Sequence, residues 1–140
     1  MAKVRELAAE KPVYTCDYVI TGAYKIQDPL SVVDIEFLRK KNPLIISGIG
    51  NPESLRYSLD SLEITGVHAA YPDHFEFDLK TLEQIRKRVE EKAHPFILTT
   101  EKDSVKLKDF DFNVPCYVIE TELKPDPAFL KEVDKLLSME

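Results

Sequence analysis

Three short polar motifs in this 140-residue sequence contain residue types that can do chemistry. They are a glycine turn at 47–53 (SGIGNPE), a Pro-Asp-His triplet at 72–74 and the run TTEKD at 99–103. An imidazole titrates near neutral pH and can serve as an acid, a base or a hydrogen-bond donor to phosphate. Hydroxyl groups and a lysine ammonium can surround an anion. The motifs therefore indicate acid–base chemistry or anion binding.

The glycine turn joins an apolar run to a helix start. The run at 44–46 predicts a buried strand, and Asn51-Pro52 predicts a helix N-terminus with proline at its first position. In open parallel sheets such a junction lies at the carboxyl ends of the strands, where anions bind. Gly48, Gly50 and Asn51 are therefore candidate ligands of a phosphate. Alternatively, the two glycines only permit a tight turn. The turn is neither a complete dinucleotide fingerprint nor a GxxxxGK[ST] loop.

The triplet presents Asp73 and His74 behind a proline that stiffens the loop. A carboxylate beside an imidazole favours its charged form, so this pair is a candidate for acid–base catalysis. The alternative is a solvated surface loop with a capping aspartate. His68 and His94 fall within a strand and at a helix end, where structural roles are expected. The three histidines lack the ligand spacing of a zinc site, so the sequence predicts no metal site.

The third motif places Thr100, Glu101, Lys102 and Asp103 at one junction between a strand and a helix. These side chains can form the polar wall of an anion site, with Lys102 as the positive charge. They can equally be a helix cap, with Thr100 or Asp103 accepting from helix N–H groups. Both interpretations are open at this point.

The elements that must position these motifs alternate from residue 43 onward. Expected strands lie at 44–47, 66–70, 96–99 and 116–120, and expected helices at 53–64, 79–92, 103–107 and 127–137. Strands that alternate with helices predict a parallel sheet, because parallel neighbours need a crossover that is usually helical. We therefore expect an α/β fold, a Rossmann-like three-layer sandwich with helices on both faces. All three motifs then open toward one edge.

The first third of the chain does not follow this rhythm. Residues 2–10 have helical composition, residues 12–26 predict an extended strand, and 32–38 predict a short helix. Pairing 12–26 with 114–124 would give a two-stranded linker arm. We therefore expect residues 1–30 to form a helix remnant and a linker strand. Residues 31–140 would form the α/β domain, including the returning strand at 114–124.

Composition excludes several classes of function. The formal charge of −6 and the absence of a dense basic cluster disfavour nucleic-acid binding. The sequence has only Cys16 and Cys116 and no signal-peptide pattern, which favours buried thiols in a reducing cytosol over a disulfide. No apolar run approaches the roughly 20 residues needed to span a bilayer.

Together and in this order, the three motifs resemble the C-terminal half of tetraacyldisaccharide 4'-kinase, the lipid A 4'-kinase of Gram-negative bacteria. The resemblance runs from about residue 12 to 123 and rests on GIGNPE at 48–53, YPDH at 71–74 and TTEKD at 99–103. In that family two α/β domains are joined by a two-stranded linker, and catalysis takes place in the cleft between them. The extended segments at 12–26 and 114–124 look like that linker.

The resemblance implies transfer of the ATP γ-phosphoryl group to the 4'-hydroxyl of a lipid A disaccharide precursor, at the cytoplasmic face of the inner membrane. The family's P-loop, its Mg²⁺ ligands and its catalytic acidic residues belong to an N-terminal domain that has no counterpart in these 140 residues. The chain alone is therefore expected to be soluble, cytoplasmic and inactive, with that P-loop domain, ATP and the lipid precursor as its partners.

Within this family, His74 matches the histidine that reaches toward the catalytic centre, and Asp73 is its companion. Phe75 departs from the many members that have a second histidine at this position. The other two motifs would shape the edge that faces the nucleotide. Two alternatives remain: an anion- or nucleotide-binding module without catalysis, and a module that only docks the kinase domain. Exposed linker strands could also pair two copies into a dimer.

Overall fold

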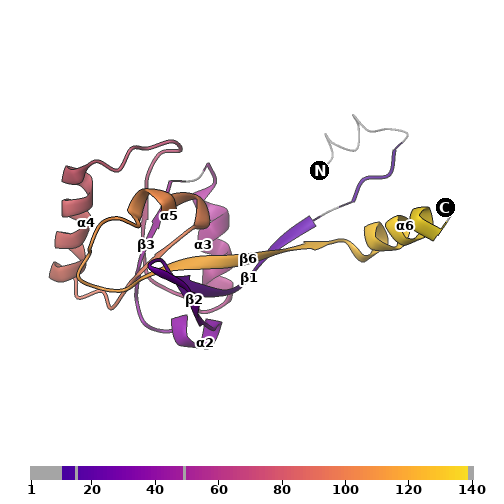
Figure 1. Ribbon diagram of the computed structural model, residues 1–140. Coiled ribbons are helices and arrows are strands. Elements are labelled where there is room, and N and C mark those ends of the chain that lie inside the picture. Colours follow the sequence, from indigo (N-terminus) through magenta and orange to yellow (C-terminus); the bar gives the residue numbers. More distant parts are fainter. Residues whose placement is uncertain (1–10, 15, 49, 139–140) are drawn as a thin grey trace. The chain divides into compact units, whose positions relative to one another are not determined.

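The structure, a computed structural model, describes residues 11–14, 16–48 and 50–138, without the side chains of 16–18 (Figure 1). The helix expected at 2–10 lies outside the described residues. The chain divides into two compact units, one comprising Met1–Val19 and Thr121–Glu140 and the other Ile20–Glu120. This division falls at residues 19/20 and 120/121. We call Ile20–Glu120 the core unit.

A six-stranded sheet has the order β2-β1-β6-β5-β3-β4. The strands are β1 (Cys16–Lys25), β2 (Asp28–Val33), β3 (Leu44–Ser47), β4 (Val67–Ala70), β5 (Ile97–Thr99) and β6 (Cys116–Pro125). β3 pairs in parallel with β4 and β5, and β5 pairs in parallel with β6, while β1 and β2 are antiparallel. The sheet is thus mostly parallel, which confirms the expected α/β class. β1 and β6 are neighbours, as the linker pairing predicted.

The described helices are α2 (Ile35–Leu38), α3 (Pro52–Ser61), α4 (Leu79–Glu91), α5 (Glu101–Leu107) and α6 (Pro127–Ser138). In each of the first four, a polar side chain immediately before the helix accepts from an N–H of its first turn, which fixes where the helix begins. These capping residues are Asp34, Asn51, Asp78 and Thr100.

Strand side chains alternate between two hydrophobic clusters, one on each face of the sheet. Ile45 packs with Leu59 of α3 in one cluster, whereas Ile46 packs with Ile85 of α4 and Leu107 of α5 in the other. Successive residues of a strand point to opposite faces, so a strand buried on both sides reads as a continuous apolar run. Figure 1 shows α3 and α4 on opposite sides of β3. The helices cover both faces, as expected.

Three expected helix boundaries were wrong. The helix expected at 53–64 ends at Ser61. The helix expected at 32–38 begins only at Ile35, because Val32 and Val33 extend β2 and pair with β1. β-branched residues favour strands, and Asp34 then caps the helix that follows. The helix expected at 103–107 begins at Glu101, since Thr100 rather than Asp103 is its N-cap.

Cys116 is a buried free thiol, as expected. The side chain of Cys16 lies outside the described residues. None of the described helices is long and apolar enough to cross a membrane.

Candidate functional site

The three polar motifs follow three adjacent parallel strands. β3 lies between β5 and β4, and all three run in the same direction. The motifs that follow them therefore emerge at one edge of the sheet, which we call the carboxyl edge. A hydrogen bond from the Tyr71 N–H to the Ser47 carbonyl, 2.7 Å long, ties the second motif to the first.

Asp103 connects the glycine turn to α5. Its carboxylate is fully buried, and Oδ2 accepts from the Gly48 N–H at 2.9 Å and from the Thr100 hydroxyl at 2.7 Å. The Asp103 N–H donates in return to the Thr100 hydroxyl oxygen at 3.2 Å. This reciprocal pattern is the capping arrangement that the sequence left open. The Gly48 N–H is thereby used within the fold.

Gly48 is packed closely against this carboxylate. A Cβ at this position would lie 3.2 Å from Asp103 Oδ1 and 3.4 Å from the Pro72 carbonyl oxygen. A side chain at this position would therefore need the Asp103 carboxylate to shift by a few tenths of an ångström, so the close approach favours glycine. Oδ1 has no hydrogen-bond partner in the described part of the chain, so any enlargement here crowds an already unsatisfied buried oxygen.

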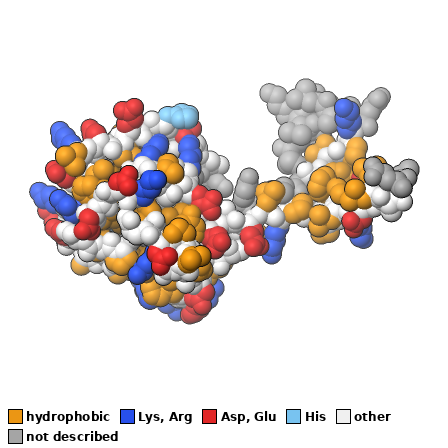
Figure 2. Space-filling model, viewed as in Figure 1, with side chains coloured by type: hydrophobic (Ala, Val, Ile, Leu, Met, Phe, Trp, Pro, Cys, Tyr) orange, Lys and Arg blue, Asp and Glu red, His pale blue; other side chains and the backbone are white. Residues whose placement is uncertain are grey.

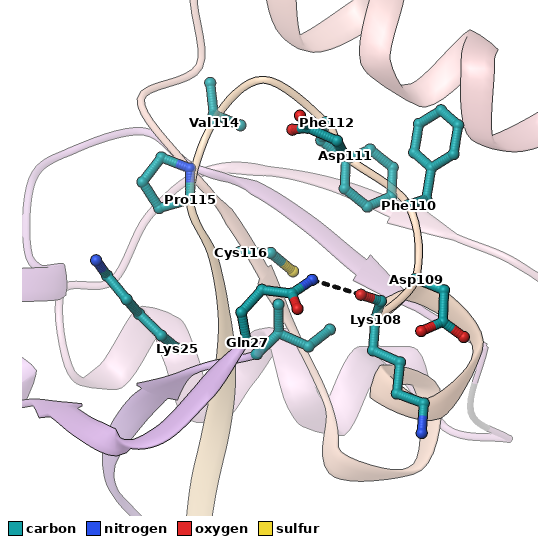
Figure 3. Close-up of a pocket in the computed structure, with 11 residues that line it drawn as sticks. Lys25, Gln27, Lys108, Asp109, Phe110, Asp111, Phe112, Val114, Pro115 and Cys116 are labelled. Carbon is teal, nitrogen blue, oxygen red and sulfur yellow. Dashed lines mark hydrogen bonds between the residues drawn. The ribbon is translucent and has the colours of Figure 1, made fainter.

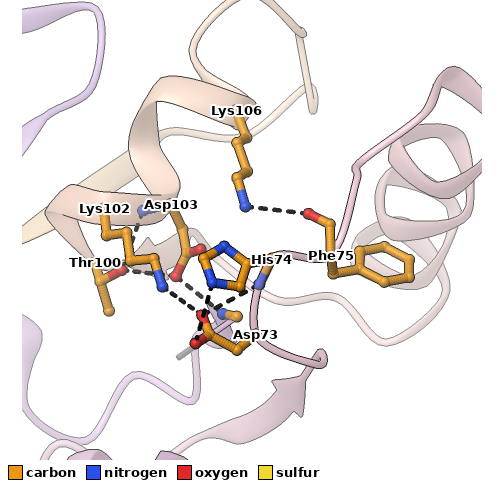
Figure 4. A network of polar contacts seen from close by, with 8 residues as sticks. Asp73, His74, Phe75, Thr100, Lys102, Asp103 and Lys106 are labelled. Carbon is orange, nitrogen blue, oxygen red and sulfur yellow. Dashed lines mark hydrogen bonds and ion pairs between the residues drawn. The ribbon is translucent and has the colours of Figure 1, made fainter. Parts of the chain in front are cut away.

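Asp73 and His74 form an exposed ion-pair network with Lys102 (Figure 4). The Lys102 ammonium pairs with Asp73 Oδ1, and His74 Nε2 lies 3.7 Å from Asp73 Oδ2. The hydrogen bond from Lys102 is the main cause that lowers the pKa of Asp73 below its ordinary value of 3.8, and His74 adds a smaller attraction. Asp73 is therefore a carboxylate throughout the neutral range, placed between the Lys102 ammonium and the His74 imidazole.

The His74 backbone has an uncommon conformation. The Phe75 N–H donates to the Pro72 carbonyl at 3.1 Å and closes a four-residue turn, in which His74 is the third residue with φ of 62°. In a turn of this kind a positive φ at the third position favours glycine or asparagine. The imidazole itself is 86% exposed. The turn thus presents the ring to solvent at the carboxyl edge.

The remaining predicted site residues differ in their surroundings. Gly50 is exposed next to the network, since a Cβ there would lie 4.0 Å from Asp73 Oδ2. The Asn51 side chain accepts from the Ser54 N–H at 3.2 Å and so caps α3. Glu101 is an exposed residue of the first turn of α5. The structure thus forms two sets of contacts at α5. Hydrogen bonds join Gly48, Thr100 and Asp103, and a second set joins Asp73, His74 and Lys102.

The sequence analysis missed Lys106. Its ammonium donates to the Phe75 carbonyl at 3.1 Å and lies 5.9 Å from the centre of the Phe77 ring. A pocket lined by His74, Phe75, Glu76, Phe77 and Lys106 adjoins it. The sequence feature that could have identified Lys106 is its spacing of four residues from Lys102, which places the two lysines on the same side of a helix.

A pocket of about 640 Å³ lies away from these motifs, beside the α5–β6 loop (Figure 3). Lys25, Gln27, Lys108 and Phe110 line it together with Cys116. Burial raises the pKa of the Cys116 thiol to about 12, so at neutral pH the sulfur is protonated and is a poor nucleophile. Both lysine and aspartate side chains line this pocket, so the lining has no clear preference for a ligand of either charge.

The described residues contain no cluster of three or more His, Cys, Asp or Glu side chains that could hold a metal ion. Asp73 is engaged by Lys102, and Asp103 is buried against Gly48. These carboxylates therefore do not fit a Mg²⁺ site made by this chain alone, and we assign no step through a metal to them.

Comparison with known proteins identifies the family. The family model of tetraacyldisaccharide-1-P 4'-kinase matches residues 2–138. The tetraacyldisaccharide 4'-kinase of Syntrophus aciditrophicus is 36% identical over 101 residues, covering 69% of this chain and 27% of that protein. Its counterpart in Rickettsia canadensis is 33% identical over 106 residues, covering 74% of this chain and 31% of that protein.

A solved structure has the same fold. The crystal structure of LpxK from Aquifex aeolicus in complex with ATP superposes with a TM-score of 0.60 at 20% sequence identity, covering 93% of this chain and 36% of that one. The chain therefore spans less than two fifths of the length of each of these proteins. Because the family model matches almost the whole chain, this protein belongs to the tetraacyldisaccharide-1-P 4'-kinase family.

Proposed function

We propose that this chain is the His74-bearing module of a lipid A 4'-kinase, which transfers the γ-phosphate of ATP to the 4'-hydroxyl of a tetraacyldisaccharide 1-phosphate. The single observation that carries the proposal is the exposed His74 imidazole, held at the carboxyl edge beside the Asp73–Lys102 ion pair. The P-loop and Mg²⁺ ligands would come from another domain, so these 140 residues alone are inactive in this proposal.

In this proposal His74 contacts the reacting groups, and the remaining network orients it. Phosphoryl transfer depends mainly on positioning and on stabilisation of charge. An imidazole at the cleft can accept a proton from the attacking hydroxyl or donate a hydrogen bond to a phosphate oxygen. The Asp73 carboxylate accepts a hydrogen bond from the backbone N–H of His74 at 3.1 Å, which restrains the backbone that carries the imidazole. Lys102 and the exposed Gly50 amide are the candidates for contact with the nucleotide phosphates.

The test is a chimera, because the chain covers only part of its relatives. The matching segment of the Syntrophus aciditrophicus kinase is replaced by this chain, and transfer of phosphate from ATP to tetraacyldisaccharide 1-phosphate is measured. We expect an active chimera and a kcat about 10²-fold lower in His74→Ala. Gln84→Ala, an exposed position on α4, is the control and keeps full activity. An unchanged kcat in His74→Ala would remove His74 from the mechanism.

The exposed surface of α6 favours docking as a second function of the chain. Leu130, Leu136 and Leu137 are 49%, 59% and 65% exposed, and hydrophobic side chains gather on this helix in Figure 2. An apolar helix face of this kind marks an interaction surface. We propose that it contacts the P-loop domain of the kinase. Binding between this chain and that domain, made separately, measures the docking, and loss of binding when α6 is removed is the expected result.

ATP titration of the chain alone separates the proposals. A module that binds nucleotide by itself gives chemical-shift changes at the His74 ring and the Gly50 amide at millimolar ATP. A module that only docks or completes the active site gives none. The Gly48 amide serves as an internal reference, because it already donates to Asp103.

A further inference from the structure

Lys106 lies one helical turn beyond Lys102 on α5, and the two ammonium groups hold the same loop at two places. Lys102 pairs with the carboxylate of Asp73, the residue before His74. Lys106 donates to the carbonyl of Phe75, the residue after His74. Residues four apart share one side of a helix, so both lysines reach the loop from the same direction. The residues on both sides of His74 are thus each held by a lysine of α5 (Figure 4).

The contacts of Lys106 differ from those of a surface lysine. Its ammonium is partly buried, donates to a backbone carbonyl, and lies within cation–π range of Phe77. Within the described residues no carboxylate forms a salt bridge with it. A charged donor makes a stronger hydrogen bond than a neutral one, and its strength rises with burial. The acceptor belongs to the backbone of the turn, so the bond acts on the conformation of the turn.

The turn needs such support. His74 has a positive φ, which is unfavourable for a residue with a side chain, and within the turn the Phe75-to-Pro72 hydrogen bond and the bond from the His74 N–H to Asp73 Oδ1 oppose this cost. On the other side of Phe75, its ring packs against Tyr71 and Phe77 with centroids 4.9 and 5.2 Å away. The carbonyl of Phe75 is thus fixed by Lys106 while its ring is fixed by the aromatic cluster.

We infer that Lys106 is a positioning residue that keeps the 72–75 turn closed and His74 at positive φ, independently of the Lys102–Asp73 pair. The consequence for catalysis rests on the proposed function. The consequence for the turn does not, because it concerns only the conformation of this chain. Lys106→Met retains the aliphatic stem over Phe77 and removes the donor, whereas Lys106→Arg retains both.

The experiment uses NMR on the full 140-residue chain. In wild type we expect a strong intraresidue HN–Hα NOE at His74, which a positive φ produces, and a protected Phe75 amide. In Lys106→Met we expect the His74 NOE to weaken and Phe75 amide exchange to rise about tenfold. The reason is that this variant loses one charge-assisted hydrogen bond. Lys106→Arg restores both signals. Lys87→Met, at an exposed lysine on α4 whose ion pair with Glu91 measures 3.8 Å, is the charge-matched control and changes neither.

Two outcomes would overturn the inference. An unchanged His74 NOE and Phe75 exchange rate in Lys106→Met would mean that the turn holds itself. A rise in exchange throughout the core unit, or failure of Lys106→Met to fold, would assign Lys106 to general stability rather than to the turn. In the chimera, the expected signature is a lower kcat with unchanged KM for ATP and recovery in Lys106→Arg. An inactive chimera would defeat the proposed function and leave the NMR result standing.

Discussion

His74 combines an exposed imidazole with a backbone φ of 62°, a conformation that favours glycine over residues with a side chain. Glycine adopts this conformation without steric cost, although it loses more entropy on folding. We therefore expect His74→Gly to leave the free energy of unfolding unchanged or to raise it by up to about 1 kcal/mol. Chemical denaturation of the chain measures this change.

Glu63 provides the matched control, because it has nearly the same φ, 61°, and precedes β4 far from the carboxyl edge. Glu63→Gly should change stability in the same way, whereas only His74→Gly should inactivate the chimera. If His74→Gly destabilised the chain by several kcal/mol while Glu63→Gly did not, the imidazole would be part of the fold rather than of the site.

Residue types predicted part of this network and not the rest. Thr100 and Asp103 are three residues apart before an apolar helix, a spacing typical of a reciprocal cap, and the structure has this cap. The contact of Lys106 with the Phe75 carbonyl could not be predicted, because every residue has a carbonyl and only the path of the loop selects one. The burial of Asp103 could likewise not be predicted from the sequence, because its partner Gly48 is 55 residues away along the chain.

Adjacent strands β3 and β4 bring Ser47 and His68 together at the scale of elements. The Ser47 hydroxyl and His68 Nε2 are 2.6 Å apart. Burial lowers the pKa of His68 below its ordinary value of 6.5, and Arg56 lowers it further. At a pH between the folded and the unfolded pKa, the unfolded chain therefore binds the extra proton. Stability is fully present above about pH 6.5 and decreases as the pH falls toward the folded pKa.

We expect the thermal midpoint of wild type to fall between about pH 7.5 and about pH 5, and His68→Gln to reduce this slope. Differential scanning calorimetry at several pH values measures both. The pKa values of Asp73 and Asp78 are also lowered in the folded chain. These carboxylates do not contribute to the slope in this pH range, because they titrate below pH 3.8. Equal slopes in wild type and His68→Gln would show that His68 is not linked to folding in this range.

The elements from residue 43 onward were predictable because each strand is a short apolar run and each helix has a capping residue before it. β2 was missed for a physical reason: an edge strand is exposed, and its residues lack the apolar run of a central strand. Leu30 and Val32 are 93% and 60% exposed. Only pairing with β1 makes this segment a strand, and pairing is not a local property of the sequence.

At the scale of the whole molecule, α6 is distinguished by contributing no residue to either core cluster of the described chain. The rings of Tyr14 and Phe129 pack in a tilted arrangement within its own unit, with centroids 5.4 Å apart. Both core clusters are formed by residues of the core unit itself. We expect a chain that ends after Pro125 to keep its thermal midpoint within about 2 °C, which corresponds to less than about 1 kcal/mol.

The same deletion should abolish activity of the chimera and binding to a separately made P-loop domain. The reason for this expectation is the proposed contact of the exposed leucines of α6 with that domain. Calorimetry and the binding measurement then report on different properties of one variant. A midpoint lowered by many degrees would show that α6 packs on the core unit, and its apolar face would then be an internal surface of this chain rather than a docking site.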